Sequence, residues 1–480
     1  MTLRPLVAVL LLGLLTAEPA LAETPPTPSL SKVTESLERE IRRILDETGV
    51  PSISLALVRD GKVAWSGAYG FANVGARVPA TTDTYYNTGS TFKFVTATAV
   101  MRLAEQGKLT LDTPLNQIVG SELAIEGADD VTLRHLLSHT SGLDAFAVAR
   151  RPRHDAGPVT TVPLWSRLAP FSLRDLLAHT RRRGPPGVEH SYCNDCYGIA
   201  GYVVERVSGT SYDGYVAEHV LRPLGVEIDR PSVPAPRVVE HLALPYGLDG
   251  NESRPLPQVR YDAFPAGDAY LRATDMARFV AAQLNDGEYD GKRILSEASA
   301  RELRRRQFDF RPYGLGVGLA DVDGRDVLHH GGGIPGYTAR LMADPAAGVG
   351  VYIMANAGEV QALGPLARHA MRLLWGDDPD PLPSFAERTE VAIDPGTFDA
   401  YVGEYELTPV LKISVTREGG RFFVQPIGRS RVEIFPVSES EFFMQRGGTT
   451  IVFGRDDDDG PVTHLILRQG GADRRADRVR

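Results

Sequence analysis

The sequence predicts an α+β fold in which helices flank an antiparallel sheet and form an all-helical subdomain, with a small all-β barrel at the C-terminal end. A helix and a hairpin pattern open the first part of the chain, and several strand patterns and a helix close it, so both ends are expected to share one sheet. A segment rich in Pro and Asp then interrupts regular structure at 376–383. Beyond it, apolar and polar residues alternate in short runs, which is typical of the strands of β-barrels and β-sandwiches.

Length and composition narrow the class of protein. The 480 residues exceed the size at which single hydrophobic cores stop growing, which predicts more than one domain. Hydrophobic residues make up 42% and charged residues 24%, as in globular proteins. A net charge of -9 disfavours binding to the phosphate backbone of nucleic acids, so we expect no nucleic-acid partner.

The N-terminus has the pattern of a secretory signal peptide. Arg4 precedes an apolar run from Leu6 to Leu15, and the small-x-small triplet 20–22 follows. The run is shorter than the ~20 residues that a membrane-spanning helix needs. We therefore expect residues 1–22 to be removed, leaving a periplasmic or secreted protein without a transmembrane anchor.

The elements of the first domain are expected in chain order. Apolar residues recur at helical spacing from Ser31 to Thr48, and alternating runs flank the turn dipeptide Asp60-Gly61. Further helical patterns cover 91–106, 133–137, 198–207 and 360–375, and strand patterns cover 314–322, 325–330, 338–344 and 348–356. The stretch 226–257 shows little periodicity and is expected to be a long loop.

Domain boundaries follow from the segment rich in Pro and Asp. We assign residues 23–376 to the first domain, 377–392 to a linker and 393–470 to the barrel. The Arg-rich end, 471–480, is expected to be disordered. Strand patterns of the barrel region cover 401–406, 411–417, 421–425, 432–436, 441–445, 449–453 and 462–468.

Ser90 and Lys93 are the first candidate catalytic residues. They lie one helical turn apart, on the same face, at the start of a predicted helix. A lysine held near the positive end of a helix among apolar neighbours loses affinity for its proton, and it can then deprotonate a nucleophilic serine. The alternative is that Ser90 is only an N-cap, and the same spacing recurs at Ser29 and Lys32, so the pattern needs support.

Two further motifs supply that support. Tyr192-Cys193-Asn194 follows Lys93 in the chain, and His330-Gly331-Gly332 comes later on a predicted strand. In this order the motifs resemble the S-x-x-K, Y-x-N and H-x-G elements of the serine β-lactamase and penicillin-binding-protein superfamily, especially its class C β-lactamase, D-alanyl-D-alanine carboxypeptidase and esterase branch. The resemblance runs from about Leu37 to Trp375 and includes the segment 136–143, whose His139 and Ser141 we assign structural roles.

The resemblance implies a role for each polar residue. Ser90 would be acylated, Tyr192 would share proton transfer with Lys93 as a phenolate stabilised by nearby positive charge, and Asn194 would orient the substrate and Lys93. The alternative for Tyr192 is a core aromatic residue at a helix start. A rival match at 85–87 precedes Ser90 and therefore breaks the family's order.

The third motif supplies the other side of the expected site. His330, rather than His329, replaces the Lys of a K-T-G motif, because only this register places 336–337 where the family has its Gly-aromatic pair. Gly332 lets the strand approach the substrate closely. The resemblance implies an oxyanion hole from the backbone N–H groups of Ser90 and Gly333. A histidine weakens the charge that would bind a substrate carboxylate, so such a site is less committed to penicillins than a K-T-G site.

The only cysteines, Cys193 and Cys196, leave two interpretations open. An oxidising compartment permits a local disulfide, and two buried free thiols are the alternative. A structural zinc site needs four ligands, which the sequence does not arrange, so we expect no metal and no cofactor.

Together these features predict an exported serine hydrolase that forms an acyl-enzyme on β-lactam, D-amino-acid peptide or amide, or ester substrates. Its partner would be a small molecule or peptide, with cell-wall-derived compounds among the candidates. The residues beyond Ile393 resemble lipocalin-like barrel modules appended to this branch, on the signature 401–405. The alternative function is a non-catalytic protein that binds a peptide or lipid in the same pocket or in the barrel.

Overall fold

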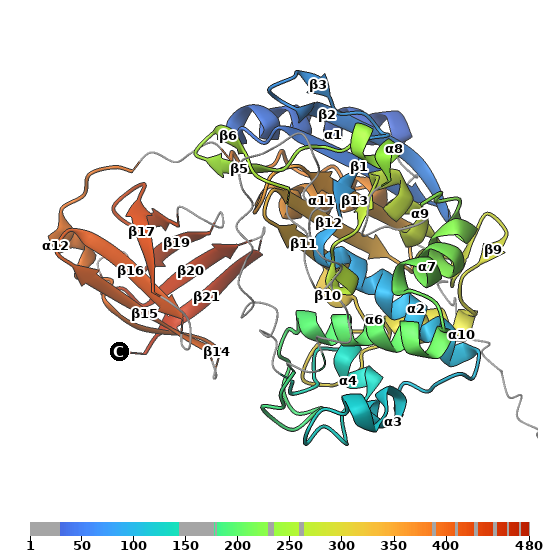
Figure 1. Ribbon diagram of the computed structural model, residues 1–480. Coiled ribbons are helices and arrows are strands. Elements are labelled where there is room, and N and C mark those ends of the chain that lie inside the picture. Colours follow the sequence, from blue (N-terminus) through green and yellow to red (C-terminus); the bar gives the residue numbers. More distant parts are fainter. Residues whose placement is uncertain are drawn as a thin grey trace, which may run out of the picture.

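Two bodies make up the described part of the chain (Figure 1), a sheet covered by helices and a barrel drawn in orange to red. The computed structural model describes residues 29–143, 177, 180–228, 235–258, 264–385, 390–408, 411–426, 431–444, 449–457, 460–469 and 472–479. The expected signal peptide, residues 1–22, lies outside these ranges. None of the helices within them combines the length and apolar character that a membrane crossing needs.

A seven-stranded sheet forms the centre of the first body, in the order β10-β11-β12-β13-β1-β2-β3. Every neighbouring pair is antiparallel, and strands from the two ends of the domain meet where β1 pairs with β13. The strands are β1 (Ser52–Arg59), β2 (Lys62–Asn73), β3 (Val78–Pro79), β10 (Gly318–Val322), β11 (Arg325–Ile334), β12 (Tyr337–Asp344) and β13 (Val349–Ala355). The expected antiparallel sheet shared by both ends of the domain is thus confirmed.

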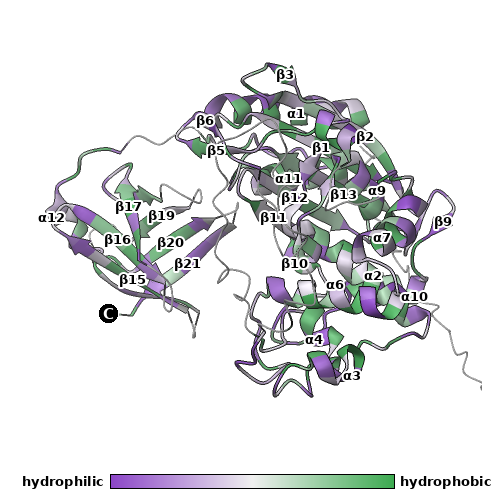
Figure 2. Ribbon diagram, viewed as in Figure 1, coloured by the Kyte–Doolittle hydropathy of each residue, from purple (hydrophilic) through white to green (hydrophobic). Residues whose placement is uncertain are grey.

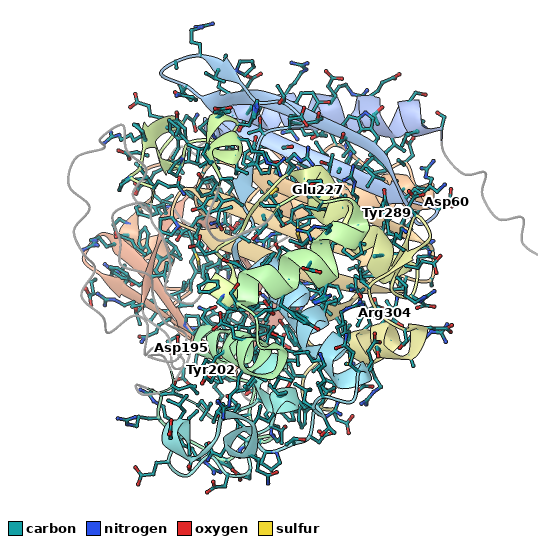
Figure 3. All side chains as sticks on the ribbon, turned by 45° about the vertical axis from the view of Figure 1, so that its right-hand side comes forward. Asp60, Asp195, Tyr202, Glu227, Tyr289 and Arg304 are labelled. Carbon is teal, nitrogen blue, oxygen red and sulfur yellow. A yellow bond between two sulfur atoms is a disulfide. The ribbon has the colours of Figure 1, made fainter. Side chains whose placement is uncertain are left out.

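The N-terminal helix α1 (Leu30–Thr48) and the helix α11 (Leu363–Trp375) cover one face of this sheet. The helix α1 begins where the Ser29 hydroxyl accepts the Lys32 backbone N–H, and it ends at Gly49, whose φ of 67° suits glycine. The buried stripe of α1 packs with α11 and with the apolar side chains of β1 and β13. Asp60, labelled in Figure 3, marks the turn between β1 and β2, as the sequence predicts.

The opposite face carries the helices that position the candidate site. The helix α2 (Lys93–Glu105) is buried along almost its whole length, between the sheet and the helix α6 (Asn194–Ser208) in Figure 1. Phe94 of α2 meets Phe279 of α9 (Ala273–Leu284) edge to face at 5.3 Å. The other helices of this side are α3 (Leu115–Val119), α4 (Leu133–Leu137), α7 (Tyr212–Val216), η5 (Ala217–Leu221) and α10 (Glu297–Arg304).

The stretch 226–257 is more regular than expected, where it is described. It contains the helix α8 (Pro236–Glu240) and a hairpin of β5 (Tyr246–Asp249) and β6 (Glu252–Pro255). Gly250, with a φ of 59°, closes the hairpin turn. The expected long loop is therefore wrong here, because strands of four residues are too short to produce a readable alternation.

The C-terminal body is a closed barrel of eight antiparallel strands. Its interior is filled by side chains, with Phe398 of α12 (Pro395–Phe398) in contact with Phe422, Phe442 and Phe453. The strands are β14 (Gly403–Thr408), β15 (Leu411–Glu418), β16 (Arg421–Pro426), β17 (Val432–Pro436), β18 (Glu441–Phe443), β19 (Thr450–Gly454), β20 (His464–Gln469) and β21 (Ala472–Arg478).

The last strand corrects the expected disorder of 471–480. Residues 472–478 form β21, which pairs with β20 and β14 and so closes the barrel. Ala476 of β21 is fully buried, while the arginines of this strand give it the hydrophilic colour seen in Figure 2. The sequence pattern did not indicate this strand because most of its side chains are charged and exposed. Closing the barrel depends on pairing of the backbone more than on apolar side chains.

Candidate active site

Ser90 lies in the turn η1 (Gly89–Phe92) that leads directly into α2. Gly89 has a φ of 51°, and a Cβ at this position would lie 2.6 Å from the backbone nitrogen of Gly333. Only glycine therefore permits this turn to lie against β11. The close approach joins the residue before Ser90 to Gly333, and Ser90 and Gly333 are the two residues expected to form the oxyanion hole.

Lys93 is fully buried at the first position of α2. Its Nζ lies 3.0 Å from the Oγ of Ser90, 2.8 Å from the Oδ1 of Asn194 and 2.6 Å from the carbonyl oxygen of Ala266 in η7 (Phe264–Ala266). Burial lowers the pKa of Lys93 well below its ordinary value. A neutral amine has two N–H groups, which Asn194 and Ala266 accept, so its lone pair faces the Ser90 hydroxyl.

Tyr192 precedes α6 by two residues and reaches the same site. Its ring lies 4.9 Å from the Nζ of Lys93, measured to the ring centre, and 41% of the residue is exposed. Desolvation raises the pKa of Tyr192 to about 12, against the opposing effect of a hydrogen bond with Ser90. The structure therefore favours a neutral phenol. The phenolate that the resemblance implies would need a positive charge nearby, and the lowered pKa of buried Lys93 disfavours such a charge.

His330 lies on β11 with 7% of its surface exposed. Its Nδ1 is 2.7 Å from the carbonyl oxygen of Gly331, so Nδ1 carries the hydrogen, and Nε2 accepts from the Tyr313 hydroxyl at 3.0 Å. Burial lowers the pKa of His330 to about 3. The imidazole is neutral at physiological pH, so His330 contributes no positive charge to this side of the site. No motif indicated Tyr313, because it is brought to His330 only by the fold.

The glycines of β11 differ in their surroundings. A Cβ on Gly332 would lie 2.2 Å from the carbonyl oxygen of Thr88, so this position admits no side chain. A Cβ on Gly333 would meet nothing within 4 Å, which shows that this residue borders open space. His329 lies elsewhere, with its Nε2 2.7 Å from a Cβ built on Gly318 of the neighbouring β10, which supports the choice of His330.

The rival motif at 85–87 does not supply a second set of catalytic groups. The Tyr86 hydroxyl is buried and hydrogen-bonds with Ser52 of β1 at 2.9 Å. Asn87 accepts the backbone N–H of Gly89 at 2.9 Å and donates to Asp268 at 2.6 Å, so it supports the turn that carries Ser90. The sequence motifs did not indicate this supporting role.

The two cysteines form a disulfide within the Tyr192 motif, with their Cα atoms 5.4 Å apart. Cys193 is also the N-cap of α6, because its Sγ accepts the backbone N–H of Cys196. The disulfide thus links the residue between Tyr192 and Asn194 to the first turn of α6, where Figure 3 labels Asp195. Of the two interpretations left open by the sequence, the structure shows the disulfide.

The family model described as Beta-lactamase matches residues 37–374, a range that contains every site residue above. The chain belongs to the beta-lactamase family. This confirms the superfamily that the three sequence motifs indicate.

The chain is also similar to several penicillin-binding proteins. The chain is 32% identical over 327 residues to penicillin-binding protein 4 of Amycolatopsis lactamdurans, covering 65% of this chain and 82% of that protein. It is 24% identical over 437 residues to penicillin-binding protein 4* of Bacillus subtilis (strain 168), covering 88% of this chain and 93% of that protein. The octameric penicillin-binding protein homologue from Pyrococcus abyssi is similar in structure, with a TM-score of 0.60, 25% identity, and coverage of 92% of this chain and 99% of that one.

Proposed function

We propose that this member of the beta-lactamase family is an exported serine hydrolase that acts through an acyl-enzyme on Ser90. One observation supports the proposal above all others. The Nζ of fully buried Lys93 contacts the Oγ of Ser90 at 3.0 Å while two oxygen acceptors occupy its N–H groups. A lysine in this setting is a base directed at one hydroxyl.

The reaction divides into two proton-balanced halves. The Lys93 amine takes the Ser90 proton as Oγ bonds to the substrate carbonyl carbon, and the backbone N–H groups of Ser90 and Gly333 stabilise the oxyanion. The leaving nitrogen or oxygen departs with a proton from the Tyr192 hydroxyl, which the Lys93 ammonium replaces. In the second half a water molecule gives a proton to the same pair as it attacks the acyl carbon. The pair then returns that proton to the Oγ of Ser90 as the acyl bond breaks and the acid leaves.

Neutral His330 favours substrates that do not depend on a carboxylate. With a pKa of about 3, His330 supplies no cation where a K-T-G site has lysine. Among the β-lactam, D-amino-acid peptide or amide, and ester substrates expected from the sequence, we propose that amides and esters without a free carboxylate at this position react fastest. The substrate would be a small molecule or peptide, with cell-wall-derived compounds among the candidates.

Export is supported by the disulfide as well as by the signal-peptide pattern. The bond between Cys193 and Cys196 fits an oxidising compartment, such as the periplasm or the extracellular space. The alternative of lipid binding in the barrel finds little support, because aromatic side chains fill the barrel interior.

Labelling tests the nucleophile. Wild type, Ser90→Ala and Ser29→Ala are incubated with a fluorophosphonate and with a fluorescent penicillin, and adducts are located by mass spectrometry. We expect an adduct on Ser90 in wild type and none in Ser90→Ala. Ser29→Ala is the matched control, since Ser29 has the same spacing to Lys32 but only caps α1. An adduct on another serine, or equal labelling of Ser90→Ala, would overturn the proposal.

A panel of substrates tests specificity. Turnover of nitrocefin, acyl-D-Ala-D-Ala, D-amino-acid amides and short-chain nitrophenyl esters is compared for the purified mature protein. We expect esters or amides to give the highest kcat/KM because they need no cation at His330. A clear preference for acyl-D-Ala-D-Ala would show that another residue binds the carboxylate.

A further inference from the structure

A turn at 138–143 contacts the backbone on both sides of Tyr192. It follows α4, and its second residue, His139, is fully buried. His139 has a φ of 60°, in the left-handed region that residues other than glycine rarely adopt. Such a conformation persists where the surrounding structure demands it, and it is common near functional sites.

Three contacts join His139 to the Tyr192 segment. The carbonyl oxygen of His139 accepts the backbone N–H of Ser191 at 2.8 Å. Its Nδ1 accepts the backbone N–H of Cys193 at 3.0 Å. Its ring lies against the ring of Tyr192, with centres 4.2 Å apart and planes at 31°. His139 therefore holds the chain immediately before and after Tyr192 and contacts the Tyr192 ring as well.

These contacts require a neutral imidazole. An Nδ1 that accepts a hydrogen bond carries no proton, so the hydrogen of the ring lies on Nε2. That Nε2 is buried and has no hydrogen-bond partner among the described residues, so Cys193 provides the polar contact that orients the ring. Burial lowers the pKa of His139 well below its ordinary value. The titratable or charged groups near it are Lys93, His190, Tyr192, Tyr197, Arg311, Tyr313 and His330.

Burial alone does not hold Tyr192. The residue is 41% exposed, so neighbouring side chains cover only part of it. Its hydroxyl nevertheless has to stay beside Ser90 to pass a proton. We propose that His139 is a positioning residue, which keeps the Tyr192 hydroxyl at Ser90 by holding Ser191, Cys193 and the Tyr192 ring. This inference rests on the proposed acyl-enzyme function.

Paired substitutions separate positioning from folding. His139→Phe keeps a ring but removes the Nδ1 acceptor, whereas His139→Asn keeps an acceptor at nearly the same place and tolerates positive φ. His139→Gly also tolerates positive φ and covers the case in which the phenylalanine variant does not fold. The matched control is His369→Phe. His369 is 4% exposed on α11, and its Nε2 contacts the hydroxyl of Ser36 on α1, remote from the site.

Two measurements are made on each variant. The first is the kinetics of acylation of Ser90, namely the single-turnover rate as a function of pH together with separate values of kcat and KM. The second is the rate of hydrogen exchange of the Cys193 amide, followed by mass spectrometry. We expect His139→Phe, or His139→Gly in its place, to lower the acylation rate about 100-fold with little change in KM, because a small displacement of a reacting group has this effect. The Cys193 amide should exchange faster in the same variant. His139→Asn should recover most of the rate and protection.

The outcomes are distinct. Acylation at the wild-type rate with an unchanged Cys193 amide in folded His139→Phe or His139→Gly would overturn the inference, and so would an equal loss in His369→Phe. Failure of wild type to acylate Ser90 would instead overturn the proposed function. Amide exchange would then still decide whether His139 holds the Tyr192 segment, because that measurement needs no substrate.

Discussion

The proposed role of Lys93 as a base requires an uncharged amine, and its surroundings favour that state. It is fully buried, and no carboxylate among the described residues pairs with it. The acceptors at Asn194 and Ala266 are neutral oxygens, which stabilise an ammonium less than an ion pair would. Desolvation therefore dominates, and it lowers the pKa of Lys93.

This assignment predicts the acid limb of activity. Below the lowered pKa Lys93 is an ammonium and cannot accept a proton, so the acylation rate should rise as pH rises through that pKa. Lys93→Arg keeps a cation that does not deprotonate, and it should lose about 100-fold or more in acylation together with the acid limb. Single-turnover acylation against pH measures both effects. With a pKa of about 12, Tyr192 should add no limb between pH 5 and 9.

Exposed Lys108, just after α2, provides the control. Lys108→Arg should leave the rate and its pH dependence unchanged, and circular dichroism should show Lys93→Arg to be folded. If folded Lys93→Arg acylates with the wild-type rate and pH profile, Lys93 is not the base, and the proton leaves Ser90 through Tyr192 or another group.

At the scale of elements, the first turn of α6 connects the proposed functional groups Tyr192 and Asn194 to the scaffold. Tyr192 and Asn194 lie on either side of Cys193, which caps this helix and is bonded to Cys196. The Oγ of Ser141 lies 3.1 Å from the Sγ of Cys196, so the turn at 138–143 contacts this element as well. The N-cap and the disulfide therefore both fix Cys193, which lies between the two functional side chains, Tyr192 and Asn194.

Substitution of the cysteines separates the cap from the disulfide. Cys193→Ser with Cys196→Ala removes the bond but keeps a good N-cap, whereas alanine at both positions removes both. The chain-entropy relation gives about 2 kcal/mol for so short a loop, and loss of a cap costs about 1 kcal/mol. We expect the serine variant to melt below wild type and the double alanine variant to melt lower still, as measured by calorimetry. Equal melting of both variants would show that Cys193 does not stabilise α6 as a cap.

The elements also show how far sequence patterns reach. Periodicity placed α1 and α11 within a few residues, because each buries an apolar face, and the Asp60-Gly61 dipeptide placed the turn between β1 and β2. It missed β21, whose arginines point outward, and the hairpin of β5 and β6, whose strands are too short to alternate visibly. The motif order indicated Ser90, Lys93, Tyr192 and His330. It could not indicate Tyr313, which lacks a motif and reaches the site only through long-range packing.

At the scale of the whole molecule, the segment after α11 is attached to the first body. Arg43 of α1 donates to the carbonyl oxygens of Leu382 and Pro383, and Glu47 accepts the backbone N–H of Phe385 at 2.6 Å. Glu40, 8% exposed, pairs with Arg43 and accepts the Leu382 N–H. The part of the assigned linker up to residue 385 therefore packs as an extension of the hydrolase domain.

Truncation at two points tests whether the barrel is needed. Every residue placed in the candidate site lies before 376, and the barrel has an aromatic core separate from that of the first body. A chain ending after Phe385 should therefore stay soluble and acylate Ser90 at the rate of the full-length chain. A chain ending after Gly376 loses the contacts of Arg43 and Glu47, and it should melt a few degrees lower, since ~1 kcal/mol shifts the Tm of a large domain by about 2 °C. Arg43→Ala in the full chain, a matched control, should lower Tm in the same direction without changing acylation. Insolubility or loss of acylation in the chain ending at 385 would show that the barrel is an integral part of the hydrolase, and equal melting of the two truncated chains would show that the contacts of α1 with 382–385 do not stabilise it.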